Sequence, residues 1–307
     1  MYLSGFADEA AEDIESQIKA TKELGWHYIE ARQINRKNIS ALSEGEFEFV
    51  CQELRKKEIK INCFASTIAN WQKTIDSPLQ EDLKEVKQTI PRMKKLQTKM
   101  VRIMSYAPLK DQAGNILPEQ REKEIFRRLR IICKMFNEEG ILPVHENCMT
   151  YGGLNWQNTM KLIHNVPGLS LVYDTGNPLA VALSEIQDFK NKDINENITW
   201  EFYSHIKEHI SYVHIKDCRY DSEKKQIEYT FPGEGQAAVK QIVKDLLDNG
   251  YDGGFSIEPH MAVVYHDPKV TLGARERFEN YINYGCYFMK LLGEIEHEES
   301  KNNKKMS

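Results

Sequence analysis

Four short segments indicate how this 307-residue chain folds: Val144-His145-Glu146-Asn147, Val172-Tyr173-Asp174-Thr175-Gly176-Asn177, Val213-His214-Ile215-Lys216-Asp217 and Ser256-Ile257-Glu258-Pro259-His260. Each has an apolar residue at its first or second position and carries a side chain that can bind a metal ion, in turn Glu146, Asp174, His214 and Glu258. Apolar runs of this kind are typical of buried parallel strands. Because the carboxyl ends of barrel strands meet on one face, we expect these four side chains to converge on one site.

The rest of the chain extends this pattern to eight strands that alternate with amphipathic helices. The expected strands span residues 2–6, 27–31, 59–64, 100–104, 141–146, 169–174, 212–216 and 255–258. Glycines that end helices precede three of them, at Gly25, Gly140 and Gly250. An open doubly wound sheet would need a glycine-rich turn after its first strand, and Gly5-Phe6-Ala7-Asp8-Glu9 is not one. The sequence therefore predicts an α/β protein with a single (β/α)8 TIM barrel.

Composition and charge limit the functional classes. Hydrophobic residues make up 41% of the chain and charged residues 28%, and the formal net charge is −5. This charge argues against nucleic acid as a partner. The six cysteines are scattered without a Cys-x-x-Cys pair, and no apolar run approaches the roughly 20 residues that span a membrane. The first residues lack the basic region of a signal peptide, so we expect a cytoplasmic protein with no membrane partner.

The four strand-end side chains together predict a metal centre. Each has a simpler explanation alone: a salt bridge or helix cap for Glu146, an N-cap for Asp174, and packing for His214. Together, however, they would repel one another without a cation. A site of three carboxylates and one imidazole suits a hard or borderline divalent ion. We expect one ion, with Mn²⁺ preferred and Mg²⁺, Co²⁺ or Zn²⁺ as alternatives.

The motifs His-Glu-Asn, Asp-Thr-Gly-Asn, His-Ile-Lys-Asp, Gly-Glu-Gly and Glu-Pro-His resemble those of the xylose-isomerase-like TIM-barrel superfamily of sugar isomerases and epimerases. The similarity runs over residues 1–292. It implies that Glu146, Asp174, His214 and Glu258 are the metal ligands. It also implies that Glu146 and Glu258 act as the catalytic acid and base.

The resemblance implies a divalent-metal-dependent sugar isomerase or epimerase. A metal that polarises a carbonyl makes the neighbouring carbon-bound proton acidic, and a carboxylate removes it to give a metal-bound enediolate. Return of the proton to the other face is epimerisation, and return to the neighbouring carbon is isomerisation. A small sugar, keto-sugar or cyclitol is the expected substrate.

Further residues near these strand ends are candidates for catalysis or substrate binding. His145 is a candidate second base, although strand alternation directs its side chain away from that of Glu146. His260 and Lys216 lie two residues after a ligand and should point the same way. The other expected substrate contacts are Arg219, Asn147, Asn177 and Trp71. Packing, capping or a surface ion pair is the alternative for each of them.

Two loops and a tail complete the predicted organisation. Loops 106–118 and 178–197 follow strands at the active-site face, and we expect the second to cover the site. The catalytic domain is expected to span residues 1–293, followed by a polar, disordered tail at 294–307. Glu234 in the Gly-Glu-Gly motif would repel a phosphate, which favours an unphosphorylated substrate.

One alternative function shares the same first step. Some superfamily members form the large subunit of C-glycoside deglycosidases, lyases that eliminate the aglycone from a 3-keto-glycoside with a small β-rich partner subunit. His145 beside Glu146 and an aromatic platform at Trp71 fit that reading. An abasic-site endonuclease would need more histidines at strand ends and a basic face, and a non-enzymatic barrel would tolerate loss of Glu258. We also expect the protein to be an oligomer.

Overall fold

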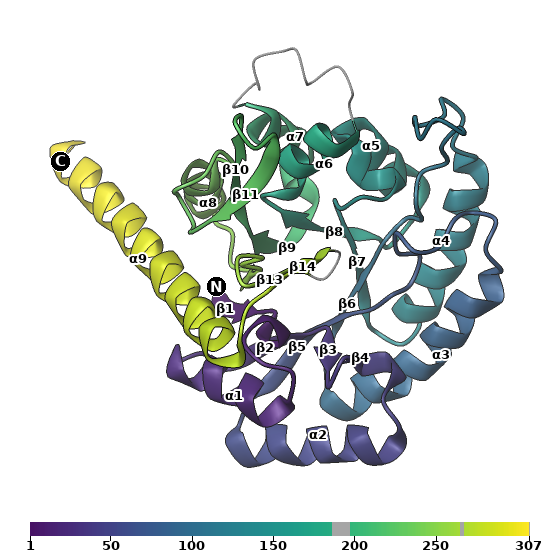
Figure 1. Ribbon diagram of the computed structural model, residues 1–307, viewed down its shortest axis with the longest axis horizontal. Coiled ribbons are helices and arrows are strands. Elements are labelled where there is room, and N and C mark those ends of the chain that lie inside the picture. The colour runs from purple at the N-terminus through teal and green to yellow at the C-terminus, as the bar shows by residue number, and fades with distance from the viewer. Residues whose placement is uncertain (186–196, 265–266, 307) are drawn as a thin grey trace.

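The computed structural model describes residues 1–185, 197–264 and 267–306. Eight parallel strands form a nearly closed barrel surrounded by helices (Figure 1). Around the barrel the strands follow the order β1 (Tyr2–Gly5), β12 (Gly254–Ile257), β9 (Ile210–Ile215), β8 (Ser170–Asp174), β7 (Leu142–Glu146), β6 (Met100–Ile103), β5 (Lys60–Ala65) and β2 (Tyr28–Ala31). β1 contacts β2 and completes the ring. The TIM barrel and its eight strands are therefore confirmed, with each strand within two residues of its expected position.

The helices lie outside the strands and follow them in the order of a β/α barrel. They are α1 (Ile14–Glu23), α2 (Glu44–Lys57), α3 (Leu79–Leu96), α4 (Glu122–Asn137), α5 (Trp156–Asn165), α6 (Asn177–Glu185), α7 (Ile198–Ile206), α8 (Val239–Asp248) and α9 (Ala274–Met306). The helix-ending glycines Gly25, Gly140 and Gly250 have φ values of 73°, 69° and 79°. These left-handed conformations confirm why glycine stands at those positions.

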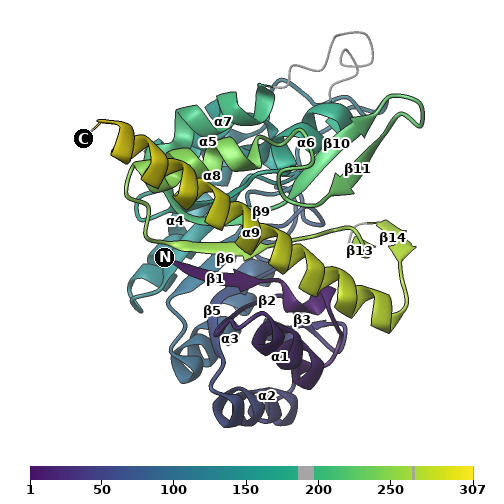
Figure 2. The same cartoon turned by 90° about the vertical axis from the view of Figure 1, so that its left-hand side faces the viewer.

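Three two-stranded hairpins were not predicted from the sequence. They are β3 (Gln33–Ile34) with β4 (Lys37–Asn38), β10 (Asp217–Asp221) with β11 (Gln226–Thr230), and β13 (Val263–Val264) with β14 (Asp267–Thr271). The β10–β11 hairpin projects beyond the barrel in Figure 2. It directly follows β9, so a predicted metal-ligand strand leads into it.

The two predicted loops differ from each other. Residues 106–118 contain one isolated β-bridge, between Lys110 and Ile116. The first part of the 178–197 segment is helical, because α6 begins at Asn177 and ends at Glu185. The expected cover over the site falls on residues 186–196, which lie outside the described residues.

The polar tail also differs from its expectation. α9 continues through the predicted disordered segment as far as Met306. Two features stabilise the helix past residue 293. Ile295 is fully buried, and Lys240 on α8 pairs with Glu298 at 2.8 Å. The domain boundaries themselves stay a prediction. No described helix is long and apolar enough to cross a membrane.

Candidate metal centre

The four predicted ligands meet at the carboxyl ends of the strands. Strand pairing places Asp174 of β8 beside His214 of β9, and the amide of Glu258 donates to the carbonyl of Ile215 at 3.0 Å. One ligand atom from each of Glu146, Asp174, His214 and Glu258 lies within 4.8 Å of the others. Donor atoms that share one ion lie at most two bond lengths apart, about 4–5 Å, so the spacing fits a single divalent cation.

One atom of every ligand is held by the surrounding protein, and the other faces a common point, where Asn177 Nδ2 also donates to Glu146 Oε1 at 3.2 Å. Arg102 binds Oε2 of Glu146 at 2.9 Å, and Arg32 binds Oε1 of Glu258 at 2.8 Å. Oδ1 of Asp174 accepts hydrogen bonds from the backbone amides of Gly176 and Asn177, at 2.9 and 2.8 Å.

His214 shows the same division of its two ring nitrogens. Nε2 lies 3.1 Å from a carboxylate oxygen of Glu30, whereas Nδ1 has no hydrogen-bond partner among the described residues although it is fully buried. Nδ1 lies 3.8 Å from Glu146 Oε1, 3.9 Å from Asp174 Oδ2 and 3.8 Å from Glu258 Oε2. A nitrogen fixed through its second ring atom and surrounded by carboxylates is typical of a metal-binding histidine. The residues present therefore fit a divalent cation.

Burial and charge set the protonation of these groups. Burial opposes the ionisation of Glu146, but Arg102 and His214 lower its pKa to about 2. Lys216, His260 and Arg32 likewise outweigh burial and hold the pKa of Glu258 well below its usual range. Both glutamates are thus carboxylates at neutral pH.

The pKa values of Asp174 and His214 are instead raised. Burial raises the pKa of Asp174 to about 7, against the attraction of Lys216. Burial alone would lower the pKa of His214, but Glu30 and Glu146 raise it to about 10. Asp174 therefore has the greatest need of a cation to stabilise its charge.

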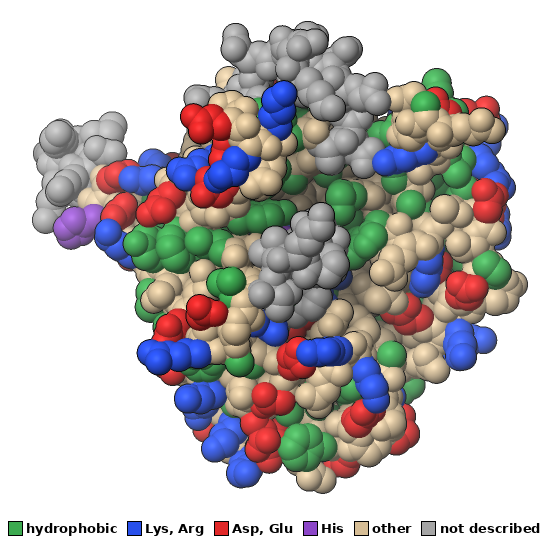
Figure 3. Space-filling view, viewed as in Figure 1, with side chains coloured by type: hydrophobic (Ala, Val, Ile, Leu, Met, Phe, Trp, Pro, Cys, Tyr) green, Lys and Arg blue, Asp and Glu red, His purple; other side chains and the backbone are tan. Residues whose placement is uncertain are grey.

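A cavity opens beside the ligands and contains several predicted substrate residues. Trp71, Asn177, Lys216 and His260 line it, together with Met149, Ala180, Val181 and Tyr229. Its walls thus combine polar groups beside the ligands with an apolar side. Hydrophobic side chains gather toward the middle of this face of the molecule, whereas Lys and Arg intermingle with Asp and Glu around it (Figure 3).

Lys216 and His260 point toward the ligands, as expected from their spacing. Nζ of Lys216 lies 2.9 Å from Asp174 Oδ2 and 2.8 Å from Glu258 Oε2. Nε2 of His260 lies 3.7 Å from Glu258 Oε1, and its Nδ1 lies 3.0 Å from Glu9 Oε1. The backbone amide of His260 donates to the other oxygen of Glu9 at 2.8 Å, so Glu9 holds both the ring and the main chain.

Three other predicted residues do not face the cavity. The ring of His145 is fully buried behind Glu146, with Nε2 2.9 Å from Ser105 Oγ, as strand alternation indicates. Asn147 is buried and braces β7 against β8 through two hydrogen bonds to the backbone of Asp174. Arg219 is exposed on the β10–β11 hairpin, where it pairs with Glu228 at 2.8 Å. These placements support structural roles for them.

Sequence reasoning missed Arg102, Glu9 and Tyr229. Arg102 had a visible signal, because it is the one charged residue in the apolar run Met100–Met104. Glu9 follows β1 and lies 251 residues from its partner His260, so only the closed barrel brings them together. Tyr229 belongs to the unpredicted hairpin. Its ring meets that of His260 edge-on, with the two ring centres 5.2 Å apart.

The motif residues Asp217 and Gly235 have a structural role. Asp217 Oδ2 accepts hydrogen bonds from the amides of Gly233 and Gly235, at 2.8 and 3.1 Å, and its Oδ1 accepts from Ala237 at 3.1 Å. The amides that would bind a phosphate at this turn thus already bind a carboxylate. This arrangement agrees with an unphosphorylated substrate.

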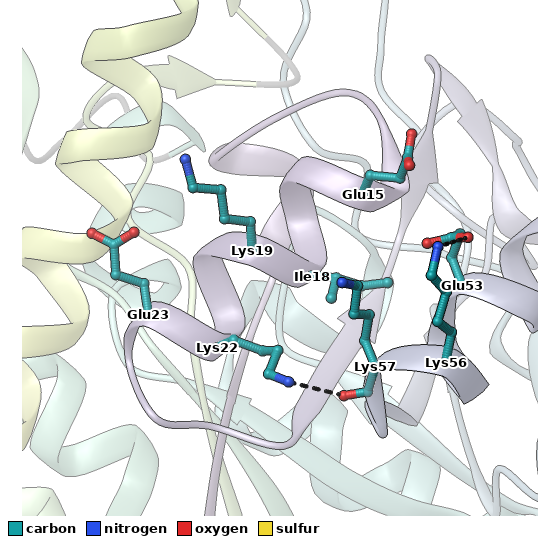
Figure 4. Close-up of a pocket in the computed structure, with 8 residues that line it drawn as sticks. All are labelled: Glu15, Ile18, Lys19, Lys22, Glu23, Glu53, Lys56 and Lys57. Carbon is teal, nitrogen blue, oxygen red and sulfur yellow. Dashed lines mark hydrogen bonds and ion pairs between the residues drawn. The ribbon is translucent and has the colours of Figure 1, made fainter.

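A separate groove lies on the outside of the barrel (Figure 4). It is lined by residues of α1 and of the end of α2, namely Glu15, Ile18, Lys19, Lys22, Glu23, Glu53, Lys56 and Lys57. Lys56 pairs with Glu53, and Lys22 donates to the backbone of Lys57. Four lysines and three glutamates line this groove, and none of the four candidate ligands does.

Comparisons with known proteins agree with this architecture. The family model described as xylose isomerase-like TIM barrel matches residues 18–281. No curated protein matches the chain by sequence. A D-tagatose 3-epimerase-like protein superposes with a TM-score of 0.68 at 15% identity, over 97% of this chain and 99% of that one.

Two further solved structures are similar. A xylose isomerase-like TIM barrel protein from Mycobacterium smegmatis, in complex with magnesium, has a TM-score of 0.64 and 17% identity, over 91% of this chain and 89% of that one. The 3-keto-D-glucoside 4-epimerase from E. coli has a TM-score of 0.58 and 14% identity, over 92% and 98% of the two chains. At these identities the structural likeness establishes the fold alone.

Proposed function

Because the chain belongs to the xylose isomerase-like TIM barrel family, we propose that it is a divalent-metal-dependent isomerase or epimerase of an unphosphorylated sugar or cyclitol. The observation that carries this proposal is the ligand set itself. In Glu146, Asp174, His214 and Glu258 one atom is fixed by the protein and the other faces the same buried point. This set of three carboxylate oxygens and one imidazole nitrogen fits a divalent cation.

The metal would act as a Lewis acid and template for a carbonyl and its neighbouring hydroxyl group. Its identity is part of the proposal. Three oxygen ligands favour Mn²⁺ or Mg²⁺, and Co²⁺ and Zn²⁺ are the alternatives. One neighbour in the fold was solved with magnesium and another with a zinc atom. The chain supplies acid–base groups from two sides, since Glu146 and Glu258 end strands that β8 and β9 separate. Their lowered pKa values mean that both side chains are ionised at neutral pH.

We assign proton transfer to these two glutamates. One carboxylate removes the proton from the carbon beside the carbonyl and becomes a carboxylic acid. For isomerisation this acid returns the proton to the neighbouring carbon. For epimerisation the other glutamate takes up a proton from solvent and donates it to the opposite face. Lys216, Asn177 and His260 would bind substrate oxygens, and Trp71 would pack against the sugar ring.

The related alternative is a lyase that eliminates the aglycone of a 3-keto-glycoside. The apolar side of the cavity, with Trp71, Met149 and Val181, favours it because it suits an aglycone. A neighbour in the fold is a 3-keto-D-glucoside 4-epimerase. His145, however, faces away from the cavity and does not support this alternative. The reading also requires a small β-rich partner subunit, so elimination only by a copurified complex would favour it over epimerisation.

Solvent deuterium exchange tests the proposed chemistry. The Mn²⁺-loaded protein is incubated in D₂O with a panel of keto-sugars that includes 3-keto-glycosides, and the labelled carbon is located by NMR. We expect exchange at one carbon beside the carbonyl for at least one substrate, with no exchange for Glu258→Gln. Absence of exchange across the panel, in protein shown to hold its metal, would contradict the proposal.

Localisation and assembly are also part of the proposal. The six cysteines are free, which fits a reducing compartment, and we propose that the enzyme works in the cytoplasm. Five of these thiols are buried. The oligomeric state stays a prediction that size-exclusion chromatography with light scattering would test.

A further inference from the structure

We infer that Lys216 is the internal counter-ion of the ligand set, and that a divalent cation binds by displacing its ammonium from Asp174 and Glu258. The inference rests on the proposed metal site and adds a competitor built into the chain. On this inference, Lys216 lowers the affinity of the site for a divalent cation.

The geometry shows that the ammonium and a cation need the same two atoms. Nζ of Lys216 lies 2.9 Å from Asp174 Oδ2 and 2.8 Å from Glu258 Oε2. These are the oxygens that face Nδ1 of His214, at 3.9 and 3.8 Å. The second oxygen of each carboxylate is already held, by backbone amides for Asp174 and by Arg32 for Glu258. Neither carboxylate can therefore offer the cation one oxygen and the ammonium another without giving up a fixed contact.

The electrostatics also favour competition. The Lys216 side chain is only 4% exposed, so water screens its charge weakly. A divalent cation at the ligand atoms would place two positive charges close together in this buried space. In the structure, the ammonium instead partly offsets the repulsion among three carboxylates. Metal binding must therefore overcome both the broken ion pairs and the repulsion from Lys216.

The surroundings of Lys216 allow its tip to move while its stem stays in place. A Cβ atom on Gly176 would lie 2.8 Å from Cγ of Lys216 and 3.0 Å from Cδ, so the stem packs closely against the backbone of residue 176. Nζ also lies 3.2 Å from Oδ1 of Asn177, which lines the cavity. Asn177 thus offers the displaced ammonium a partner on the substrate side.

Titration of the metal-stripped full-length protein with Mn²⁺ in a calorimeter tests the inference. Lys216→Met removes the ammonium and keeps an unbranched stem, and we expect it to bind Mn²⁺ about tenfold more tightly than the wild type or better. Without metal, this variant should melt at a lower temperature than the wild type, because three buried carboxylates lose a counter-ion. Its melting temperature should then rise more on addition of Mn²⁺.

Matched variants make each outcome decisive. Lys224→Met removes an exposed lysine of the β10–β11 hairpin and should leave Mn²⁺ affinity unchanged. Lys216→Gln keeps a neutral hydrogen-bond donor and should show the same gain if Lys216→Met fails to fold. Equal or weaker affinity in the neutral variants, with normal binding by the wild type, would overturn this inference alone. Failure of the wild type and of both variants to bind Mn²⁺ would overturn the metal-dependent function as well.

Discussion

Arg32 and Arg102 connect the two proposed acid–base residues to one aromatic ring. Their guanidinium carbons lie 4.3 and 5.5 Å from the centre of the Phe6 ring, and each arginine binds one glutamate. The ring and the carboxylates together stabilise two buried cations beside an acidic site. At the scale of residues, the proposed function therefore depends on charged partners as much as on the proposed ligands.

Glu146→Gln and Glu258→Gln should each lower kcat by a factor on the order of 10³ or more, because each removes a proton acceptor. The fold should survive, since the apolar core lies elsewhere in the barrel. Steady-state kinetics and circular dichroism of each variant measure the two effects. Glu139→Gln, which changes an exposed glutamate paired with Lys94, is the matched control. Unchanged turnover in either site variant would reject its catalytic role.

Glu9→Gln should lower kcat by a factor on the order of ten to a hundred, because Glu9 fixes the ring and the backbone of His260. Metal content should stay that of the wild type, since Glu9 binds none of the four ligand atoms that face the common point. Kinetics combined with metal analysis separate these effects. A loss of metal without a change in kcat per bound metal would show that Glu9 acts through the centre instead of through His260.

At the scale of elements, the turn after the β10–β11 hairpin shows how a motif outside the chemistry supports the site. Asp217 ends the segment that carries His214 and Lys216, and its carboxylate organises the amides of residues 233–237. Tyr284 of α9 accepts a hydrogen bond from the amide of Asp217 at 3.1 Å. The ligand strand β9 is thus connected to both the hairpin and the last helix.

Gly235→Ala should destabilise the protein by about 1–3 kcal/mol, because a Cβ there would lie 2.2 Å from Asp217 Oδ1 and 2.6 Å from the carbonyl oxygen of Cys218. Gly293→Ala is the control: no atom lies within 4 Å of its Cβ position, and it should be neutral or stabilising in the α9 helix. Urea unfolding measures both. Equal stability of the two variants would contradict the role given to Asp217.

Asp245 provides a pH-dependent link between α7 and α8. Its carboxylate accepts from Tyr203 at 2.7 Å and pairs with Lys207 at 2.9 Å, and these partners outweigh burial and lower its pKa below 3.8. The folded state then binds protons less readily than the unfolded state, so the contribution is complete above pH 3.8 and is lost as the pH falls through the lowered value.

Asp245→Asn should therefore lower the free energy of unfolding by about 1 kcal/mol at pH 7, with a difference that shrinks below pH 3.8. Unfolding by urea across this pH range measures it. Glu138→Gln, which removes an exposed pair with Lys134, should change stability by less than about 0.5 kcal/mol. A difference for Asp245→Asn that grows on acidification would contradict the assignment.

At the scale of the whole molecule, the barrel explains which parts of the site the sequence predicts. The convergence of Glu146, Asp174, His214 and Glu258 could be predicted because each lies at or next to the end of a strand of recognisable apolar pattern, and barrel closure brings strand ends together. Arg102 and Glu9 could not be paired with their partners, because those contacts depend on side-chain directions across the barrel. The β10–β11 hairpin escaped prediction because its strands, Asp217–Asp221 and Gln226–Thr230, are largely polar.

Removal of the metal should affect the stability of the entire barrel, since the ligands come from four strands. The chelated protein should melt at a lower temperature than the Mn²⁺-loaded protein, by the equivalent of about 3 kcal/mol when free metal is a hundred times the Kd. Differential scanning calorimetry at several Mn²⁺ concentrations measures this. Asp174→Asn is the comparison, and its melting temperature should respond much less to the ion. An equal response in both proteins would place the bound ion elsewhere.

Anomalous diffraction from crystals grown with Mn²⁺ tests most directly whether these four residues hold one ion. We predict a single strong peak bonded to Glu146 Oε1, Asp174 Oδ2, His214 Nδ1 and Glu258 Oε2. An anomalous peak beside other residues, or no peak between these four atoms at saturating Mn²⁺, would contradict the proposed metal site.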